Sequence, residues 1–360
     1  MKERVSLNNL PIVDSHLDLA ENMTLFGRDL TLSVTEIRMV EKRTTRQATV
    51  SLSELERGNI GVAFATVTAG FLAADVGANF EPRSAIYHTP EEAEAQAFTQ
   101  ITLYEHWEKQ GRIRILKSVY DLDHHLQLWQ DDRKPGLVLL MEGGDPIVSV
   151  GDLSRWWQHG LRIIGLTFGD TRYGIGVAGG RPTFKQGGLT AEGVDLLRHM
   201  AELGFIWDIS HLTEEGIWQG LDLKFPHVCA SHANAQALTP TDRHLSDDVI
   251  RAIAGRGGVM GLTLYSGFLA PCWKHDPSIS VTLDEHLRRH AIYVASLSSW
   301  NHVGIGSDLD GGFGLEESPS EIESVADLYK VGAVVPTEVR EAVLSTNWLN
   351  FLRSSLPQTS

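Results

Sequence analysis

Apolar runs typical of buried strands recur along this chain, and a segment with helical character follows each of them. Strongly apolar strands that alternate with helices are typical of a parallel sheet whose faces are covered by helices. Eight repeats of this unit predict an α/β fold, a closed (β/α)8 barrel of the TIM type with its active site at the C-terminal ends of the strands. The runs are residues 11–18, 61–67, 136–142, 161–167, 205–211, 227–232, 258–264 and 303–308.

Helices are expected at residues 32–41, from residue 89 onwards, and at 190–203, 213–221, 246–254, 283–297 and 336–352. Thr89 followed by Pro90 predicts a capped helix start, because proline fits the first helical position. A further apolar run at 113–116 could be a short strand outside the eightfold count. An open doubly wound sheet is the alternative fold, but no Gly-x-Gly-x-x-Gly motif follows the first strand to favour it.

We expect one barrel domain over residues 1–360, because neither a low-complexity linker nor an internal sequence repeat divides the chain. Two segments stand out within it. Residues of about 21–57 form a polar, charge-mixed insertion with helical character, and residues of about 174–188 form a glycine-rich loop expected on the rim of the barrel.

The net charge of −15 argues against nucleic acid or an anionic membrane surface as a partner. The two cysteines, Cys229 and Cys272, do not indicate a disulfide framework. The first residues lack the apolar run of a signal peptide, no window offers about 18 uninterrupted apolar residues, and the tail lacks a lipid-anchor signal. We therefore expect a cytoplasmic protein.

Metal-ligand residues lie at the ends of five of the predicted strands. His16 and Asp18 are separated by one residue, so a strand would direct both side chains to the same side. An isolated His-x-Asp is equally consistent with a capping Asp beside a surface His. The other strand ends carry Glu142, His211, His232 and Asp308, and no requirement of an apolar core accounts for such a set.

Three imidazoles and three carboxylates suit two divalent metals, zinc above all, with one carboxylate bridging them. Two metals about 3.5–4 Å apart can share a water molecule, lower its pKa toward neutrality and polarise a substrate carbonyl. The ligand set therefore indicates a hydrolytic centre that needs no organic cofactor.

Five motifs surround these residues: Asp14-Ser15-His16-Leu17-Asp18, Glu142-Gly143-Gly144, Asp208-Ile209-Ser210-His211, Ala230-Ser231-His232 and residues 304–311. With these motifs the chain resembles, from about residue 11 to 353, the renal (membrane) dipeptidase family, zinc-dependent peptidases built on a (β/α)8 barrel within the wider amidohydrolase group. Most amidohydrolases carry His-x-His on the first strand, so the His-x-Asp of this chain is a specific mark.

The resemblance implies two zinc ions per chain. His16, Asp18 and Glu142 would hold one ion. Glu142, His211 and His232 would hold the other, which makes Glu142 the bridge. It further implies hydrolysis of dipeptides by a metal-bridging hydroxide, including dipeptides with a C-terminal D-residue, and a homodimeric assembly.

Two further residues match family positions. Asp308 matches an aspartate that acts in proton transfer beside the bridging water. Arg243 matches an arginine that binds the substrate carboxylate, and a planar guanidinium suits bidentate carboxylate binding. Without the resemblance, a surface arginine after a turn would be an equal interpretation of Arg243.

One position departs from the family pattern. Phe168 lies where the family carries a substrate-binding histidine, and phenylalanine cannot donate a hydrogen bond to an oxyanion. Asp170, Arg172 or Tyr173 could fill that place, or the substrate could differ. A related amidohydrolase acting on a non-peptide amide, an N-acyl amino acid or a lactone is therefore an alternative, and a non-catalytic binding barrel is a remote one.

The remaining polar and aromatic candidates receive structural interpretations. Asp208 and Asp310 are expected to support the metal ligands from a second layer of contacts. His124 and His125 are expected on a solvated helix. Trp156, Trp157 and Trp207 are expected to be packing residues rather than a binding platform.

Overall fold

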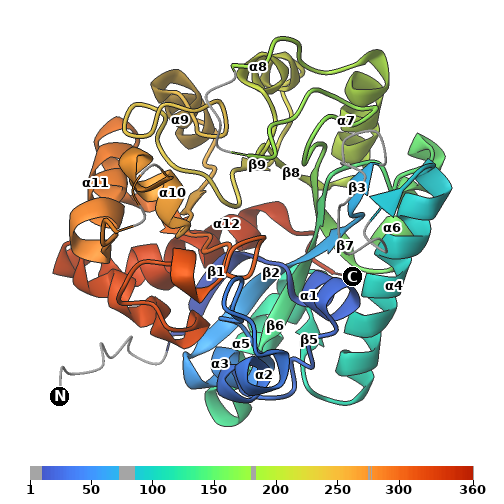
Figure 1. Ribbon diagram of the computed structural model, residues 1–360. Helices are drawn as coiled ribbons and strands as arrows, with labels where there is room; N and C mark the ends of the chain where they lie inside the picture. The colour runs from blue at the N-terminus through green and yellow to red at the C-terminus, as the bar shows by residue number, and fades with distance from the viewer. Residues whose placement is uncertain (1–9, 73–85, 180–183, 275, 277, 360) are drawn as a thin grey trace.

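A parallel barrel forms the centre of the molecule, with helices arranged around it (Figure 1). The computed structural model describes residues 10–72, 86–179, 184–274, 276 and 278–359. Neighbouring strands pair in sequence order, and a parallel bridge between Ala230 and Met260 joins the two ends of the sheet. The barrel strands are β1 (Ile12–Leu17), β2 (Ile60–Thr68), β6 (Gly136–Glu142), β7 (Leu161–Gly165), β8 (Ile206–Asp208), β9 (Val228–Cys229), β10 (Met260–Leu262) and β11 (Val303–Ile305).

The (β/α)8 prediction is confirmed, and every predicted strand overlaps one of the barrel strands. Several are shorter than predicted, because the chain leaves the ladder before the polar residues at the strand end. The run at 113–116 contains a short strand, β5 (Arg114–Ile115), which pairs with the start of β6. Two further short strands, β3 (Phe71–Leu72) and β4 (Ile86–Tyr87), pair with each other outside the barrel.

The helices follow the strands and begin at ordinary capping residues. Thr89 caps the longest of them by accepting a hydrogen bond from the backbone of Glu92, with Pro90 in the first helical position, as predicted. The helices are α1 (Leu19–Phe26), α2 (Val34–Glu41), α3 (Leu52–Arg57), α4 (Pro90–Lys109), α5 (Val119–Asp132), α6 (Leu153–Gln158), α7 (Ala191–Leu203), α8 (Glu214–Asp222), α9 (Asp247–Ala254), α10 (Ser266–Leu269), α11 (Arg288–Leu297) and α12 (Asn347–Ser355).

Short stretches of other helical types complete the pattern. A π-helical turn at Leu283–Leu287 precedes α11, and another at Ala342–Thr346 precedes α12. Among the residues described, no helix combines the length and the apolar character that crossing a lipid bilayer requires.

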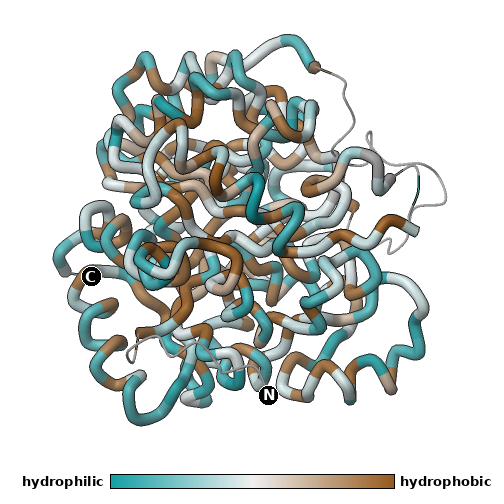
Figure 2. The backbone as a smooth tube through the Cα atoms, turned by 90° about the vertical axis from the view of Figure 1, so that its left-hand side faces the viewer, coloured by the Kyte–Doolittle hydropathy of each residue, from teal (hydrophilic) through white to brown (hydrophobic). Residues whose placement is uncertain are grey.

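Alternate residues of the longest barrel strands belong to two separate apolar clusters. In β2 and β6, for example, Ala63 and Leu139 pack outward with the surrounding helices, whereas Phe64 and Val138 belong to the cluster inside the barrel. This alternation follows from the period of two along a strand. Figure 2 shows hydrophobic stretches through the middle of the molecule and hydrophilic segments at its periphery.

Helix α12 closes the inside of the barrel at the end opposite the site. Its Trp348 packs against Phe64 with ring centroids 5.0 Å apart and donates a hydrogen bond of 3.1 Å from Nε1 to the carbonyl of Ile305. Phe351 and Leu352 extend the same inner cluster. In Figure 1 this helix, coloured red, lies near the middle of the ring.

The insertion predicted at about 21–57 contains α2, where a helix was expected, and also α3 and most of α1, which were not predicted. Ser33 and Glu36 form a complete capping box at the start of α2. In the predicted glycine-rich loop, residues 180–183 lie outside the described residues.

The expectation of a solvated His125 is wrong, although its neighbour His124 is exposed. His125 is fully buried on the inner face of α5, and its Nε2–H donates a hydrogen bond of 2.8 Å to the carbonyl of Gly61 in β2. Desolvation by burial lowers the pKa of His125 from its ordinary value of 6.5 to about 4. Trp156 and Trp207 are fully buried packing residues, as predicted.

We predict that His125 makes the protein acid-sensitive. A histidine whose pKa is lowered by folding contributes stability above pH 6.5, and this stability is lost as the pH falls toward 4. The loss is up to about 3 kcal/mol of unfolding free energy. His125→Gln can still donate to Gly61 but does not titrate, so its denaturation midpoint should fall less than that of the wild type between these pH values. Parallel pH profiles for the two proteins would contradict the assignment.

We also predict that Gly306 cannot be replaced, because a Cβ atom there would overlap the carbonyl oxygen of Ser231 and crowd the Ser15 hydroxyl. Gly306→Ala should lower the free energy of unfolding by about 1–3 kcal/mol, the usual effect of overpacking. Gly151→Ala is the control, because a Cβ there meets only the Ser149 hydroxyl, at 3.5 Å. Urea denaturation should show a change of less than about 0.5 kcal/mol for this control.

Candidate active site

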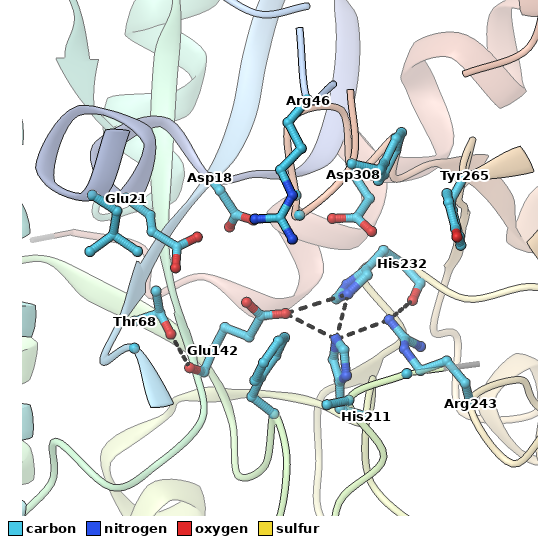
Figure 3. Close-up of a pocket in the computed structure, with 18 of the residues that line it drawn as sticks. Asp18, Glu21, Arg46, Thr68, Glu142, His211, His232, Arg243, Tyr265 and Asp308 are labelled. Atoms are coloured by element: carbon cyan, nitrogen blue, oxygen red, sulfur yellow. Dashed lines mark hydrogen bonds and ion pairs between the residues drawn. The ribbon is translucent and has the colours of Figure 1, made fainter. Parts of the chain in front are cut away.

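Three imidazoles converge on one carboxylate oxygen at the C-terminal end of the barrel, and Figure 3 shows two of them, His211 and His232, beside Glu142. Oε1 of Glu142, the last residue of β6, lies 3.4 Å from Nε2 of His16, 3.0 Å from Nε2 of His211 and 3.5 Å from Nε2 of His232. The two nitrogens of His211 and His232 are 2.8 Å apart. Strands β1, β6, β8 and β9 therefore bring four predicted ligands together.

The two aspartates predicted for the site lie beside this group. Oδ1 of Asp18, in the residue that precedes α1, is 3.6 Å from Nε2 of His16, and the Thr66 hydroxyl donates a hydrogen bond to the same oxygen. Oδ1 of Asp308, beyond the end of β11, is 4.0 Å from the same nitrogen of His16. All six residues predicted from the strand ends thus lie together around His16 Nε2 and Glu142 Oε1.

A hydrogen-bond relay through Ser231 fixes the orientation of two imidazoles. The Ser231 hydroxyl donates to the carboxylate of Asp208 and lies 3.2 Å from Nδ1 of His16 and 2.8 Å from Nδ1 of His232. Since its one proton is used by Asp208, the hydroxyl accepts Nδ1–H from both rings. Both Nε2 atoms are then left with lone pairs that face Glu142.

His211 is oriented in the same sense by the main chain. Its Nδ1–H donates a hydrogen bond of 2.8 Å to the carbonyl of Val177, so its Nε2 also carries a lone pair. His211 and Asp308 both have left-handed backbone conformations, with φ of 66° and 60°. Such conformations are unfavourable for non-glycine residues and concentrate at functional sites.

Burial disfavours the charged form of the acidic and imidazole groups in this cluster, although the Arg243 guanidinium partly offsets the charges of Glu142 and Asp308. Burial and, next, the Glu142 carboxylate raise the pKa of Asp18 to about 8, and burial raises the pKa of Glu142 to about 8 as well. Burial also raises the pKa of Asp308, and it lowers the pKa of all three imidazoles. Each group thus resists its charged form, as expected for ligands that a metal ion would neutralise.

The donor atoms fit a pair of divalent metals. His16, Asp18 and Glu142 form one group whose ligand atoms lie within 4.8 Å of one another, and Glu142, His211 and His232 form a second such group. Nε2 of His16 is buried without a hydrogen-bond partner among the described residues. A third group joins His16 and His232 to Asp208, but the Ser231 hydroxyl already links these side chains.

Arg243 lies inside the same cavity, so its interpretation as a surface residue is wrong. The residue is only 3% exposed, and its Nη2 donates a hydrogen bond of 2.9 Å to the carbonyl of His232. The same nitrogen is 3.0 Å from Nε2 of His211. Its Nε and Nη1 atoms are buried with no hydrogen-bond partner in the described part of the chain. Two donors of a planar guanidinium are thus available to an anion.

The cavity over this group has a volume of about 300 Å³. Phe168 forms part of its wall, with its ring centroid 5.0 Å from that of His211. Arg172 and Tyr173 do not fill the place of the family histidine, because both donate hydrogen bonds to the carbonyl of Ile147. Asp170 lies on the wall of an adjoining cavity, where it pairs with Lys185 at 2.8 Å.

Glu21, Arg46 and Tyr265 are among the side chains of the cavity wall that sequence reasoning missed. Glu21 could have been found, because it lies one helical turn after Asp18 at a strand-to-helix junction on the active-site end. Arg46 lies within the long insertion, where the sequence offers no such signal. The expectation that Asp310 supports the metal ligands stays a prediction, because its carboxylate accepts hydrogen bonds from the backbone of Thr49 and Val50.

With this geometry established, comparison with known proteins identifies the family. The model of the family described as membrane dipeptidase (peptidase family M19) matches residues 2–354. The chain belongs to this family. A similar protein from Klebsiella pneumoniae, described as an uncharacterised protein in the pqqA 5′ region, is 30% identical over 253 residues, which are 68% of this chain and 89% of that protein.

Other relatives match over shorter stretches. An uncharacterised dipeptidase of Schizosaccharomyces pombe is 29% identical over 59% of this chain and 49% of its own length. Dipeptidase tcpJ of Claviceps purpurea is 28% identical over 44% of this chain and 35% of its own length.

A solved structure has the same fold along nearly its whole length. A metallopeptidase from Rhodobacter sphaeroides, crystallised with a phosphinate mimic of the dipeptide L-Ala-D-Ala, superposes with a TM-score of 0.78 and 22% identity. The superposition covers 96% of this chain and 99% of the other. This likeness independently supports the barrel fold.

We predict that Asp208 tunes metal affinity through Ser231 without being a ligand. Asp208→Asn should weaken zinc binding by about 10- to 100-fold, because the orientation of His16 and His232 depends on this relay. Competition with a fluorescent zinc chelator measures the affinity. Asp248→Asn makes the same chemical change on an exposed part of α9 and should leave the affinity unaltered. Equal affinities for both variants would rule out the relay.

Proposed function

We propose that this protein is a binuclear zinc dipeptidase in which Glu142 bridges the two ions. His16 and Asp18 complete one ligand set, and His211 and His232 complete the other. The observation that carries the proposal is the position of Glu142 Oε1, within 3.5 Å of three imidazole nitrogens that all present lone pairs. The identity of the metal as zinc is supported by the mixture of imidazole and carboxylate ligands.

The reaction uses residues on both sides of this centre. When bound, the two zinc ions would lower the pKa of a shared water molecule and polarise the scissile carbonyl. Arg243 holds the substrate carboxylate through guanidinium donors that have no partner among the described residues. Asp308 takes the proton from the nucleophile and passes it to the leaving amine.

The relatives support a dipeptide as the substrate. Two of them are described as dipeptidases, and the Rhodobacter sphaeroides enzyme binds a mimic of L-Ala-D-Ala. We include dipeptides with a C-terminal D-residue in the proposal on this ground. A second candidate is hydrolysis of a non-peptide amide, an N-acyl amino acid or a lactone, which the presence of Phe168 in the cavity wall favours.

We predict two zinc ions per chain and chelator-sensitive cleavage of dipeptides. Elemental analysis gives the metal content, and a panel of L-Xaa-L-Xaa and L-Xaa-D-Xaa dipeptides gives the activity. Chelation should abolish hydrolysis, and added zinc should restore it. Two zinc ions without dipeptide cleavage would favour the second candidate, and a protein that takes up no metal would exclude both.

Asp308→Asn should reduce kcat by about 10²- to 10⁴-fold, because the amide cannot transfer the proton. The zinc content of this variant should stay at two per chain, since Asp308 belongs to neither ligand set. Steady-state kinetics and elemental analysis on the same preparation test both statements. A variant with nearly normal kcat would exclude Asp308 as the proton carrier.

Arg243→Lys should lower kcat/KM for dipeptides by about 10- to 100-fold, because lysine loses the bidentate geometry. The matched substrate is the C-terminal amide of the same dipeptide, which has no carboxylate to bind. The variant should cleave this amide about as well as the wild type does. An equal loss on both substrates would mean that Arg243 acts on the site structure and not on the carboxylate.

A further inference from the structure

One acidic side chain of the cavity has no part in the scheme above. Glu21, in the first turn of α1, lies on the cavity wall together with Asp18 and Glu142. Figure 3 shows its carboxylate directed into the cavity, on the side away from Arg243. Among the described residues, no hydrogen bond or ion pair involves this carboxylate.

A rigid network holds Glu21 at this place. The side-chain amide of Asn22, the next residue, donates hydrogen bonds to the carbonyls of Asp18 and Asp310, at 2.9 and 3.2 Å. Its amide oxygen accepts a hydrogen bond of 2.6 Å from Arg28, which is buried and lies 3.2 Å from the Asp310 carboxylate. Helix α1 is thereby fastened to the loop after β11, and Glu21 cannot swing away with a loose helix.

Glu21 is placed for a positively charged partner, and no described residue of the chain forms an ion pair with it. Desolvation and then the charges of Asp18 and Glu142 raise the pKa of Glu21 well above its usual range. Glu21 belongs to neither metal-ligand group found among the described residues. The Arg46 guanidinium lowers the pKa of Glu21, but by less than burial and the two neighbouring carboxylates raise it.

The two ends of the cavity therefore carry opposite charges. Arg243 offers guanidinium donors on one side of Glu142, and Glu21 offers a carboxylate on the other (Figure 3). A dipeptide has the same polarity, with a carboxylate at one end, an ammonium group at the other and the scissile carbonyl between them. An ammonium group beside two divalent cations needs a nearby carboxylate to offset their repulsion.

We propose that Glu21 binds the free α-ammonium group of the substrate and so restricts the enzyme to unblocked dipeptides. The proposal rests on the dipeptidase function proposed above, in which Arg243 binds the opposite end. N-acyl amino acids fit the Arg243 end but leave the Glu21 carboxylate without a partner. Since an unpaired charged group in a partly buried site is unfavourable, they should be poor substrates.

The test compares L-Ala-L-Ala with N-propanoyl-L-alanine, which has the same skeleton without the amino group. The zinc-loaded wild type should prefer the dipeptide by at least about 100-fold in kcat/KM. Glu21→Gln should lower kcat/KM for the dipeptide by about 10- to 100-fold and change that for the desamino compound by less than about threefold. Glu317→Gln removes another carboxylate of the same cavity wall and should keep the wild-type preference.

A binding measurement separates this proposal from the proposed reaction. Calorimetry compares a phosphinate mimic of L-Ala-L-Ala with its desamino analogue on the wild type and on Glu21→Gln. Tighter binding of the amino compound to the wild type, with the difference lost in the variant, supports ammonium recognition even if no dipeptide is cleaved. In that case only the proposed reaction fails.

Three results would overturn the proposal. The first is the same preference for the amino compound in wild type and Glu21→Gln. The second is no preference in the wild type. The third is a fall in kcat/KM of Glu21→Gln for L-Lys-L-Ala with no fall for L-Ala-L-Ala. That result would assign Glu21 to recognition of a basic side chain.

Discussion

The arrangement of the site depends on the desolvation of charge around a single oxygen atom. Oε1 of Glu142, a buried residue, lies among three imidazole nitrogens whose lone pairs are directed toward it. Without a metal ion, the charged form of each carboxylate and imidazole in this site has a high free energy. The site is therefore stable in its working geometry only if the surrounding hydrogen bonds fix each side chain in advance.

Those hydrogen bonds belong to two polar networks, one inside the barrel and one between the barrel and the inserted segment. Asp208 and Ser231 act within the barrel and determine which nitrogen of two histidines is protonated. Asp310 and Arg28 act outside it and fasten the insertion between β1 and β2 to the last strand. The first network prepares the metal ligands, and the second positions the wall of the cavity above them. A conventional barrel thus acquires a specific cavity through one inserted segment.

The sequence predicted the parts of the molecule that follow from periodicity and topology. Apolar runs defined the eight strands, and the rule that barrel sites lie at strand ends brought His16, Glu142 and His211 to one place before any geometry was known. The insertion could not be derived in this way, because the positions of Glu21 and Arg46 depend on long-range contacts with the loop after β11. His125 was misjudged since its helical neighbours are charged, although its own face of α5 is buried. The homodimer implied by the family stays a prediction.

The closure of the barrel by α12 has a consequence for how the chain is made. The side chains that fill the inner end, Trp348 and Phe351 among them, come after every barrel strand in the order of synthesis. During translation the strands that carry the metal ligands emerge first, and their inner faces stay exposed until this last helix arrives. The nascent chain thus holds a complete set of metal-ligand residues before it has a closed core. Until then, its exposed apolar interior is a target for chaperones and a risk for aggregation.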